Sequence, residues 1–263
     1  MRIVCLTEES VEFFYRLGRP EVVVGVSVYA VRPKTLPNAQ TLPRVSAFTH
    51  ANIKKIAELK PDLIIGYSDV QKEIAKELTD MGLPILITHQ RSIEEIFKSL
   101  ALFGNLIGEK DKTEKLIAEL KSQMQEIIDE VKCLTNRLER PIKVYFEEWD
   151  EPRIAASQWI HELLSLLGAK SLGFEKASES HKSMHRGLSD EEIIAFNPDI
   201  ILYAWCGKKG DNEKIFNRPG YDKVKAISSG NVHEISSDII LQPGIAALTD
   251  GVKILKDHLL SVK

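Results

Sequence analysis

The sequence predicts an α/β protein of two lobes, each a mostly parallel sheet flanked by helices, joined by one long helix. Three observations lead to this fold. Strand-like and helical patterns alternate over the first hundred residues, one uninterrupted helical pattern follows, and the alternation resumes after Pro141. Strand and helix alternation of this kind is typical of parallel sheets that are covered by helices.

The first lobe is predicted from short apolar runs that are separated by helical stretches. Strands are expected at 2–6, 22–26, 63–66 and 85–88, and helices at 11–17, 52–59, 70–81 and from 92. Asn52 is a suitable helix cap, and Pro61 ends the helix that it begins. The elements are short and regular, as in a compact α/β lobe.

The long helix is predicted between 109 and 139. Residues 111–138 contain neither glycine nor proline, and their apolar residues recur in steps of three and four, which marks one face of a helix. Such a helix would be about 40 Å long, which suits a connection between lobes at 1–108 and 140–263. The alternative is a long crossover helix inside a single domain.

The second lobe repeats a pattern of the first. Residues 193–202 match residues 56–65 in their apolar positions and in a central Pro-Asp pair. Strands are expected at 142–146, 200–202 and 232–235, and helices at 159–167, from a Ser189/Glu192 capping box to 196, and at 245–260. Because ligands of open α/β sheets bind beyond the carboxyl ends of the strands, two such lobes predict a ligand in an interlobe cleft.

The composition of the chain argues against some classes of binding partner and bears on its compartment. Its 263 residues carry a formal net charge of -3, so no basic surface for nucleic acid or an anionic membrane is expected. No apolar run approaches the roughly 20 residues of a membrane span. The N-terminus leads directly into a strand pattern, so we expect no signal peptide. Cys5, Cys133 and Cys206 are odd in number and widely spaced, which favours thiols and a reducing compartment.

Residues with aromatic or polar side chains follow the predicted strands and are the candidate ligand contacts. In the first lobe these are Tyr29, Phe48, Thr49, Tyr67 and Ser68. In the second lobe they are Glu148, Trp149 and Trp205, with Gln242 before the last helix. Aromatic side chains provide stacking area for a large flat ligand, and polar groups orient it. Each ring taken singly could instead cap its own core.

The segment 42–49 (LPRVSAFT), followed by Asn52-Ile53 and by 59–64 (LKPDLI), resembles helical-backbone (class III) solute-binding proteins of ABC importers. These proteins bind vitamin B12, siderophores or haem. Residues 22–29 and 104–138 fit the same family, and 145–152 (YFEEWDEP) resembles its cobalamin-binding branch. The resemblance implies two Rossmann-like lobes that hold a corrinoid ligand, with haem or a ferric siderophore as the alternative.

The resemblance also implies roles for particular residues. Positions that match the corrin-sandwiching aromatics are Tyr29, Phe48 and Tyr67, with Trp149 and His185 in the second lobe; His185 would meet a metal only through the ligand. Family members dock onto importer subunits with one acid on each lobe. Glu191 keeps that acid, but Lys54 stands at the other position. A soluble corrinoid carrier that docks to no importer is therefore an alternative. The resemblance implies a periplasmic or cell-surface location, and we expect a monomer. The three cysteines and an N-terminus without an expected signal peptide make a cytoplasmic location the alternative.

Two groups of residues are candidates for a catalytic site or a metal site. Glu147, Glu148 and Asp150 could form a carboxylate pair, but neighbouring strand residues point to opposite faces and no nucleophile accompanies them. His181 and His185 have the i, i+4 spacing of zinc ligands, yet their segment is typical of a polar loop. We therefore expect a binding protein without a catalytic or metal site, rather than a hydrolase or transferase.

Overall fold

The computed structural model describes residues 1–38, 41–135, 139–180 and 182–262. They form two compact units. Unit 1 comprises 1–90, 94–119 and 242–246, and unit 2 comprises 91–93, 120–241 and 247–263. Helix α5, at Lys110–Thr135, contributes residues to both units. The predicted end of this helix at 136–138 lies outside the described residues.

Unit 1 is built on a five-stranded sheet in which every pairing is parallel. The strand order is β3-β2-β1-β4-β5. The strands are β1 Ile3–Cys5, β2 Val23–Ser27, β3 Arg44–Ser46, β4 Leu63–Tyr67 and β5 Ile85–Thr88. The helices are α1 Glu8–Arg16, η1 Pro20–Val22, α2 Ile53–Glu58, η2 Asp69–Gln71, α3 Lys72–Asp80 and α4 Ile93–Leu106. The expected mostly parallel sheet of the first lobe is confirmed.

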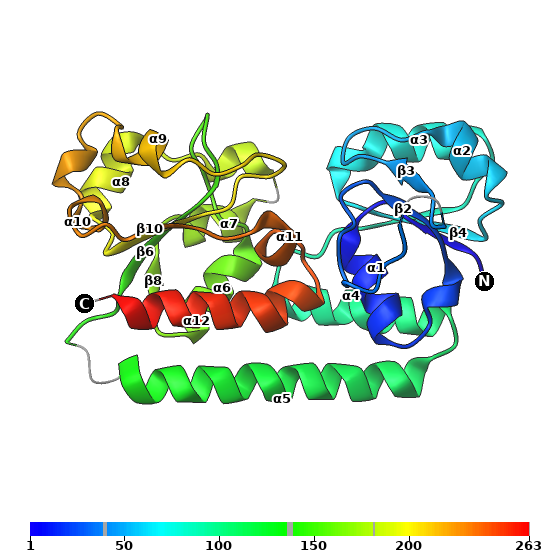
Figure 1. Cartoon of the computed structure of the whole chain (residues 1–263), viewed down its shortest axis with the longest axis horizontal. Coiled ribbons are helices and arrows are strands. Elements are labelled where there is room, and N and C mark those ends of the chain that lie inside the picture. The colour runs from blue at the N-terminus through cyan, green and yellow to red at the C-terminus, as the bar shows by residue number, and fades with distance from the viewer. Residues whose placement is uncertain (39–40, 136–138, 181, 263) are drawn as a thin grey trace. The chain divides into compact units, whose positions relative to one another are not determined.

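Helices cover both faces of the unit 1 sheet (Figure 1). On one face, Val4, Ile56 and Leu78 belong to a buried cluster that joins the sheet to α2 and α3. On the other face, the rings of Phe13 in α1 and Phe103 in α4 lie 5.8 Å apart. Alternate residues of each strand therefore pack against helices on opposite faces of the sheet. Because both faces are buried, the strands are continuously apolar in the sequence.

Unit 2 is built on a second sheet of five strands, ordered β10-β9-β6-β7 with β8 also paired to β6. Only β7 runs antiparallel to its neighbour. The strands are β6 Lys143–Trp149, β7 Ile154–Ala155, β8 Lys170–Ser171, β9 Ile200–Tyr203 and β10 Val232–Glu234. The helices are α6 Gln158–Leu166, α7 Phe174–Glu179, η3 Ser183–Arg186, α8 Asp190–Phe196, α9 Asn212–Phe216, η4 Tyr221–Lys223, α10 Lys225–Ser228, α11 Ser237–Ile240, η5 Ala247–Gly251 and α12 Val252–Ser261.

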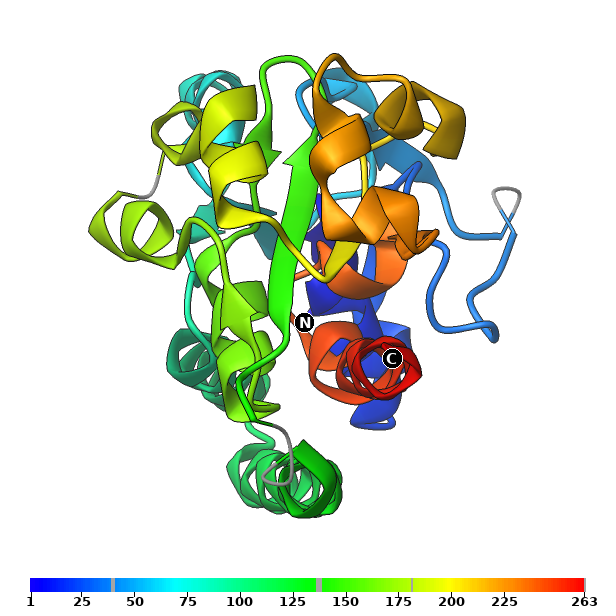
Figure 2. The same cartoon turned by 90° about the vertical axis from the view of Figure 1, so that its left-hand side faces the viewer.

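Figure 2 looks onto unit 2, where β6 is the long green strand near the centre of the view, with helices around it. Helices α8, α9 and α10 contribute to a buried cluster on one face, together with Tyr145 and Ile201 of the sheet. Helices α6 and α12 lie on the other face (Figures 1 and 2). The α/β fold class predicted for the second half is thus confirmed.

Three details of unit 2 differ from the sequence-based expectations. Strand β6 extends to Trp149, so Glu147 and Glu148 lie within the strand rather than beyond its end. The helix expected from 245 does begin there, but π-helical turns at Ala247–Gly251 interrupt it before α12. His185 lies in a short 3-10 helix, η3, where a loop was expected.

Candidate functional site

The unit 1 sheet has a topological switch point between β1 and β4. From β1 the chain adds β2 and β3 on one side, and then β4 and β5 on the other. Connections leaving two parallel neighbours in opposite directions open a crevice at the carboxyl ends of those strands, where open α/β sheets bind ligands. Thr7 and Glu8 follow β1 here, and Tyr67 and Ser68 stand at the end of β4. These four positions form the candidate half-site of unit 1.

Gln71 brings three of the predicted aromatic and polar positions together. Its side chain is fully buried, its Oε1 accepts from Tyr67 N at 2.9 Å, and its Nε2 donates to Phe48 O at 3.1 Å. Ser68 follows with φ of 60°, and its hydroxyl accepts from Val70 N at 3.3 Å. The backbones that carry Phe48, Tyr67 and Ser68 are therefore held in one cluster.

The remaining predicted positions of unit 1 lie along the same sheet edge. Tyr29 follows β2, is 47% exposed, and donates its N–H to Ser27 Oγ at 3.2 Å. Gln90 accepts from the Tyr67 hydroxyl through its carbonyl at 3.2 Å and donates from Nε2 to Pro243 O at 3.3 Å. The segment that contains Gln242 is thereby tied to the end of β4, although the two are far apart in sequence.

Glu9 is a buried acid of this edge that the sequence analysis did not single out. It is 1% exposed, and its Oε1 accepts from Thr7 Oγ1 at 2.6 Å, while its Oε2 has no hydrogen-bond partner among the described residues. Burial raises its pKa to about 7. In the sequence Glu9 is one of several acids in a first helical turn, a common and uninformative position.

Unit 2 has its own switch point, between β6 and β9. The chain adds β8 on one side of β6, and then β9 and β10 on the other, all parallel. Trp149 ends β6, and residues 204–208 follow β9. The predicted positions Glu148, Trp149 and Trp205 are therefore gathered at the carboxyl ends of two adjacent strands.

Trp205 lies in the core of unit 2. Its side chain is 4% exposed, its ring centroid lies 5.0 Å from that of Tyr203, and its Nε1 donates to Glu147 Oε1 at 2.9 Å. These contacts give the ring a structural role that its sequence position does not reveal. Ligand contact by Trp205 stays a prediction.

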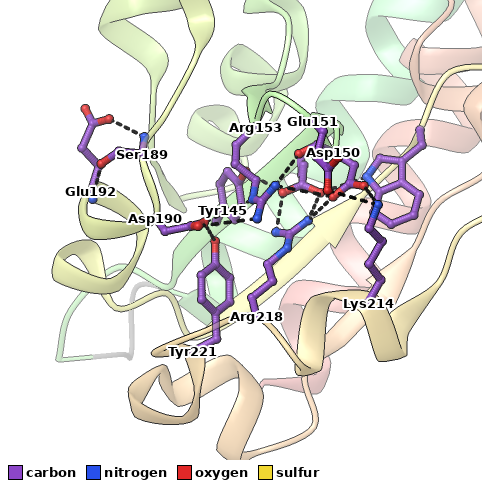
Figure 3. A network of polar contacts seen from close by, with 12 residues as sticks. Tyr145, Asp150, Glu151, Arg153, Ser189, Asp190, Glu192, Lys214, Arg218 and Tyr221 are labelled. Carbon is purple, nitrogen blue, oxygen red and sulfur yellow. Dashed lines mark hydrogen bonds and ion pairs between the residues drawn. The ribbon is translucent and has the colours of Figure 1, made fainter.

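Glu147 belongs to a buried ionic network with Arg218, and Figure 3 labels other members of this network, among them Arg218 and Asp150. Arg218 donates to both Glu147 carboxylate oxygens at 2.7 Å and to Asp150 Oδ1 at 2.8 Å, and Tyr145 OH donates to Glu147 at 2.8 Å. Lys214 also pairs with Asp150. Burial alone would raise the pKa of Asp150, but the hydrogen bonds from Lys214 and Arg218 hold it below its ordinary value.

The same network continues to the first turn of α8. Arg153 donates from Nη1 to the Asp150 carbonyl at 2.7 Å and from Nε to Asp190 Oδ1 at 3.1 Å. Tyr221 OH donates to the same Asp190 oxygen at 2.8 Å (Figure 3). Side chains of α8, η4 and the segment after β6 are thus joined through charged hydrogen bonds, which are stronger than neutral ones.

Glu148 points to the opposite face of β6 and is neutralised there. Its carboxylate accepts from Arg186 at 2.7 and 2.8 Å and from Ser157 Oγ at 2.6 Å. Burial alone would raise the pKa of Glu148, but Arg186 outweighs it and lowers the pKa. Both glutamates therefore act as acceptors in ion pairs, and the geometry does not form a pair of catalytic carboxylates.

Trp149 and His185 are the more accessible candidates of unit 2. Trp149 is half-buried, its Nε1 donates to Glu151 O at 2.9 Å, and Lys208 Nζ lies 4.0 Å from the ring centroid. His185 is exposed, and its Nδ1 lies 2.8 Å from Ser180 Oγ. His181, the other member of the weighed zinc pair, lies outside the described residues.

The two predicted docking positions are equivalent in the two units. Lys54 is the second residue of α2, and Glu191 is the second residue of α8; both side chains are exposed. Each helix leads to a Pro-Asp pair and a buried strand. Hydrogen bonds from the backbone at Glu191 and from Ser189 lower the pKa of Glu191. The repeat noticed in the sequence thus places opposite charges at matching positions.

No group of three or more His, Cys, Asp or Glu side chains among the described residues is placed to hold a metal ion. Across the same residues, no helix has both the length and the apolar character that crossing a bilayer requires.

Comparison with known proteins bears on the whole chain. It is 25% identical to an uncharacterised ABC transporter substrate-binding lipoprotein, YvrC, of Bacillus subtilis, over 98% of this chain and 79% of that protein. It is 26% identical to the vitamin B12-binding protein of Vibrio cholerae, over 76% of this chain and 69% of that protein.

Solved structures share the fold. A protein from Staphylococcus epidermidis, described as possibly iron-binding and periplasmic solute-binding, is 25% identical with a TM-score of 0.77, over 98% of both chains. A periplasmic heme-binding protein from Pseudomonas aeruginosa is 19% identical with a TM-score of 0.80, over 100% of this chain and 94% of that one. The family model for periplasmic binding proteins matches residues 3–239. The resemblance seen in the sequence is confirmed: the chain belongs to the periplasmic binding protein family.

Proposed function

We propose that this chain is the solute-binding component of an ABC-type import system and that it binds a metal-chelate small molecule. The observation that carries the proposal is the pair of topological switch points, each lined with aromatic and polar side chains. Tyr67 stands at the end of β4 in unit 1, and Trp149 stands at the end of β6 in unit 2. The names of the relatives support the class of ligand, since they include vitamin B12-binding and substrate-binding proteins.

The first candidate ligand is a corrinoid, and haem or a ferric siderophore is the alternative. The candidate contacts are Tyr29, Phe48, Thr49, Tyr67, Ser68 and Gln242 of unit 1, with Glu148, Trp149, His185 and Trp205 of unit 2. Aromatic rings supply apolar area for a large macrocycle, while hydroxyl and amide groups orient its polar edge. The chain is a binder in this proposal, and a recovered ligand is expected to be chemically unchanged.

Titration of the protein with cyanocobalamin, haemin and a ferric siderophore, followed by tryptophan fluorescence and calorimetry, tests this function. We expect saturable binding of one chelate class. Tyr67→Ala should weaken it by about 1–3 kcal/mol through lost aromatic contact. Tyr15→Phe is the matched control, because Tyr15 lies on α1 outside the candidate half-site. Failure of all three chelates to bind at high micromolar concentration would refute the proposal.

Importer docking is the second part of the function. We propose that exposed Glu191 meets cationic groups of membrane subunits and that Lys54, at the matching position of unit 1, weakens this association through like-charge repulsion. A soluble carrier that docks to no importer remains the alternative, because Lys54 departs from the acid of the family. Lys54→Glu should strengthen association with a cognate importer without changing ligand affinity. Tighter binding by the wild type than by Lys54→Glu would contradict this part.

The place of the protein in the cell and its lobe bounds are part of the same proposal. Relatives are called lipoproteins or periplasmic proteins, which supports a periplasmic or cell-surface location. We keep 1–108 and 140–263 as the two functional lobes and expect a monomer. Chromatography with light scattering on the purified chain measures the oligomeric state.

A further inference from the structure

Lys208 lies at the switch point of unit 2 in a defined position. It belongs to the turn that follows β9, and its N–H donates to Trp205 O at 3.2 Å. Trp205 is itself fixed by Glu147 and by the ring of Tyr203. The Lys208 ammonium lies 4.0 Å from the centroid of the Trp149 ring, which ends the adjacent parallel strand β6. A cation over an indole face is held by the ring quadrupole.

The charge of Lys208 is not neutralised within the described residues. The acids next to Trp149 in the sequence have other cations as partners: Glu147 and Asp150 pair with Arg218, and Glu151 Oε1 lies 3.4 Å from Lys214 Nζ. Glu148 pairs with Arg186 on the other face of β6. No ion pair or hydrogen bond of Lys208 Nζ occurs in the described part of the chain, and the side chain is exposed. Lys208 and Lys214 therefore differ. Lys214 is paired with the carboxylates of Asp150 and Glu151, whereas the Lys208 ammonium can accept an anion as its partner.

We propose that Lys208 is an anion-recognising residue of the ligand site, which binds a carboxylate or phosphate group of the ligand. The inference rests on the proposed function and adds a chemical requirement to its ligand. A cation whose stem is ordered against an indole loses less conformational entropy on binding an anion than a freely moving lysine. A hydrogen bond to a charged group is also stronger than a neutral one.

The placement of Lys208 also changes the role expected for Trp149. The ring face beneath the ammonium is covered, so a macrocycle approaching from that side meets a positive charge before it meets the indole. Trp149 then acts through Lys208, as a positioning residue on that face. A ligand whose periphery carries an anion matches this arrangement better than a wholly neutral one.

Paired chelates that differ in their anionic groups test the inference. Haemin and its dimethyl ester differ in two carboxylates, and cyanocobalamin and dicyanocobinamide differ in a nucleotide that carries a phosphodiester. Affinities of the wild type, Lys208→Met and Lys209→Met for all four are measured by calorimetry. Methionine keeps a flexible apolar stem against the ring and removes the charge. Lys209→Met is the matched control, because Lys209 is the next residue and is also exposed.

We expect the wild type to prefer the anionic member of the pair it binds by about tenfold. Lys208→Met should abolish the preference by weakening the anionic member alone, and Lys209→Met should preserve it. The pair that shows the preference identifies carboxylate or phosphate as the group recognised. Equal weakening of both members by Lys208→Met, or an equal loss in Lys209→Met, overturns the inference and leaves the proposed function standing. Binding of none of the four by the wild type overturns the inference, and the proposed function is then decided by the titration with the ferric siderophore.

Discussion

Units 1 and 2 share a helix, a Pro-Asp turn and a buried strand, but they surround the turn aspartate differently. Asp62 is 57% exposed, and its Oδ2 accepts from Arg2 N at 2.6 Å. Asp199 is 3% exposed and accepts from Arg140 at 2.7 Å, Lys225 at 2.8 Å and the Lys143 N–H at 2.9 Å. The same local sequence thus serves as a surface turn in one unit and as a buried ionic junction in the other.

The strand ends follow the same contrast. In unit 1, the side-chain amide of Gln71 and the backbone carbonyl of Gln90 hold the end of β4, whereas in unit 2 Arg218 pairs with the carboxylates of Glu147 and Asp150 at the end of β6. Amide contacts are weak individually, while a buried ion pair is costly to break from one side. We therefore expect unit 2 to be intolerant of single substitutions at its strand ends and unit 1 to tolerate them.

Arg218→Met should produce the largest effect on stability. The change leaves Glu147 and Asp150 buried without their shared partner, which should lower the free energy of unfolding by about 3–5 kcal/mol. Urea denaturation monitored by circular dichroism measures the loss. Glu147→Gln combined with Arg218→Met should recover part of it, because one buried charge is removed as well. A loss under about 1 kcal/mol would show that the network adds little to unit 2.

The second largest effect should be a dependence of the free energy of unfolding on pH, caused by Glu9 of unit 1. Its folded-state pKa, about 7, lies above its ordinary value of 4.5, so the folded state keeps a proton that the unfolded state has lost. The free energy of unfolding therefore falls as pH rises from 4.5 to 7, by on the order of 3 kcal/mol, and is flat above.

Glu9→Gln should remove this fall and unfold at higher urea than the wild type at pH 8. The pKa of His161 in unit 2 is lowered to about 4 by burial, which makes stability rise with pH between 4 and 6.5. The difference between the wild type and Glu9→Gln, measured from pH 5 to 8, isolates the contribution of Glu9. Parallel pH profiles for the two proteins would be evidence against it.

The paired substitutions Asp199→Asn and Asp62→Asn sharpen the comparison of the turns. Asp199→Asn removes the charge from a buried junction and should cost about 2 kcal/mol, while Asp62→Asn should cost less than about 0.5 kcal/mol. Burial alone would raise the pKa of Asp199, but Arg140 and Lys225 lower it well below 3.8. Its contribution is thus complete above that pH and is lost as pH falls further. Urea denaturation at neutral pH measures the loss in the free energy of unfolding for each variant. Equal losses would show that the two turn aspartates contribute equally to stability.

Lys54→Glu should have the smallest effect on stability. Lys54 lies in the first turn of α2, where the helix dipole disfavours a cation, and Glu191 occupies the matching position of α8. The substitution should raise the free energy of unfolding by about 0.5 kcal/mol at low salt, and the gain should shrink at high salt. Lys55→Glu is a poor substitute, because Lys55 Nζ donates to Arg44 O at 3.0 Å. A destabilised Lys54→Glu protein would mean that the cation makes a contact beyond the dipole.

Much of the fold was predictable because it depends on local patterns. Strand β5 begins and ends where the apolar run does, and Ser189 and Glu192 form both hydrogen bonds of the predicted capping box. Strands β7 and β8 have two residues each, too few to show a period in the sequence. They exist because β6 offers them a neighbouring backbone.

The candidate site was predictable only in part, for a similar reason. Strand ends can be read from the sequence, so Tyr67 and Trp149 were found at the edges expected. Their partners could not be found, because Gln71 reaches Phe48 across 23 residues and Arg218 reaches Glu147 across 71. The burial of Trp205 likewise depends on side chains that only the folded sheet brings together.

The segment that contains Gly244 prevents the two units from being separated by cleaving the chain at one position. Gly244 belongs to the 242–246 segment of unit 1, while the chain before and after that segment belongs to unit 2. A Cβ atom at this position would lie 2.6 Å from the Cβ of Glu9, so the segment packs against α1 at a distance that only glycine allows. A chain ending near residue 140 would therefore lose a piece of unit 1 that is encoded near the opposite terminus. Unit 1 can be completed only after nearly the whole polypeptide has been synthesised.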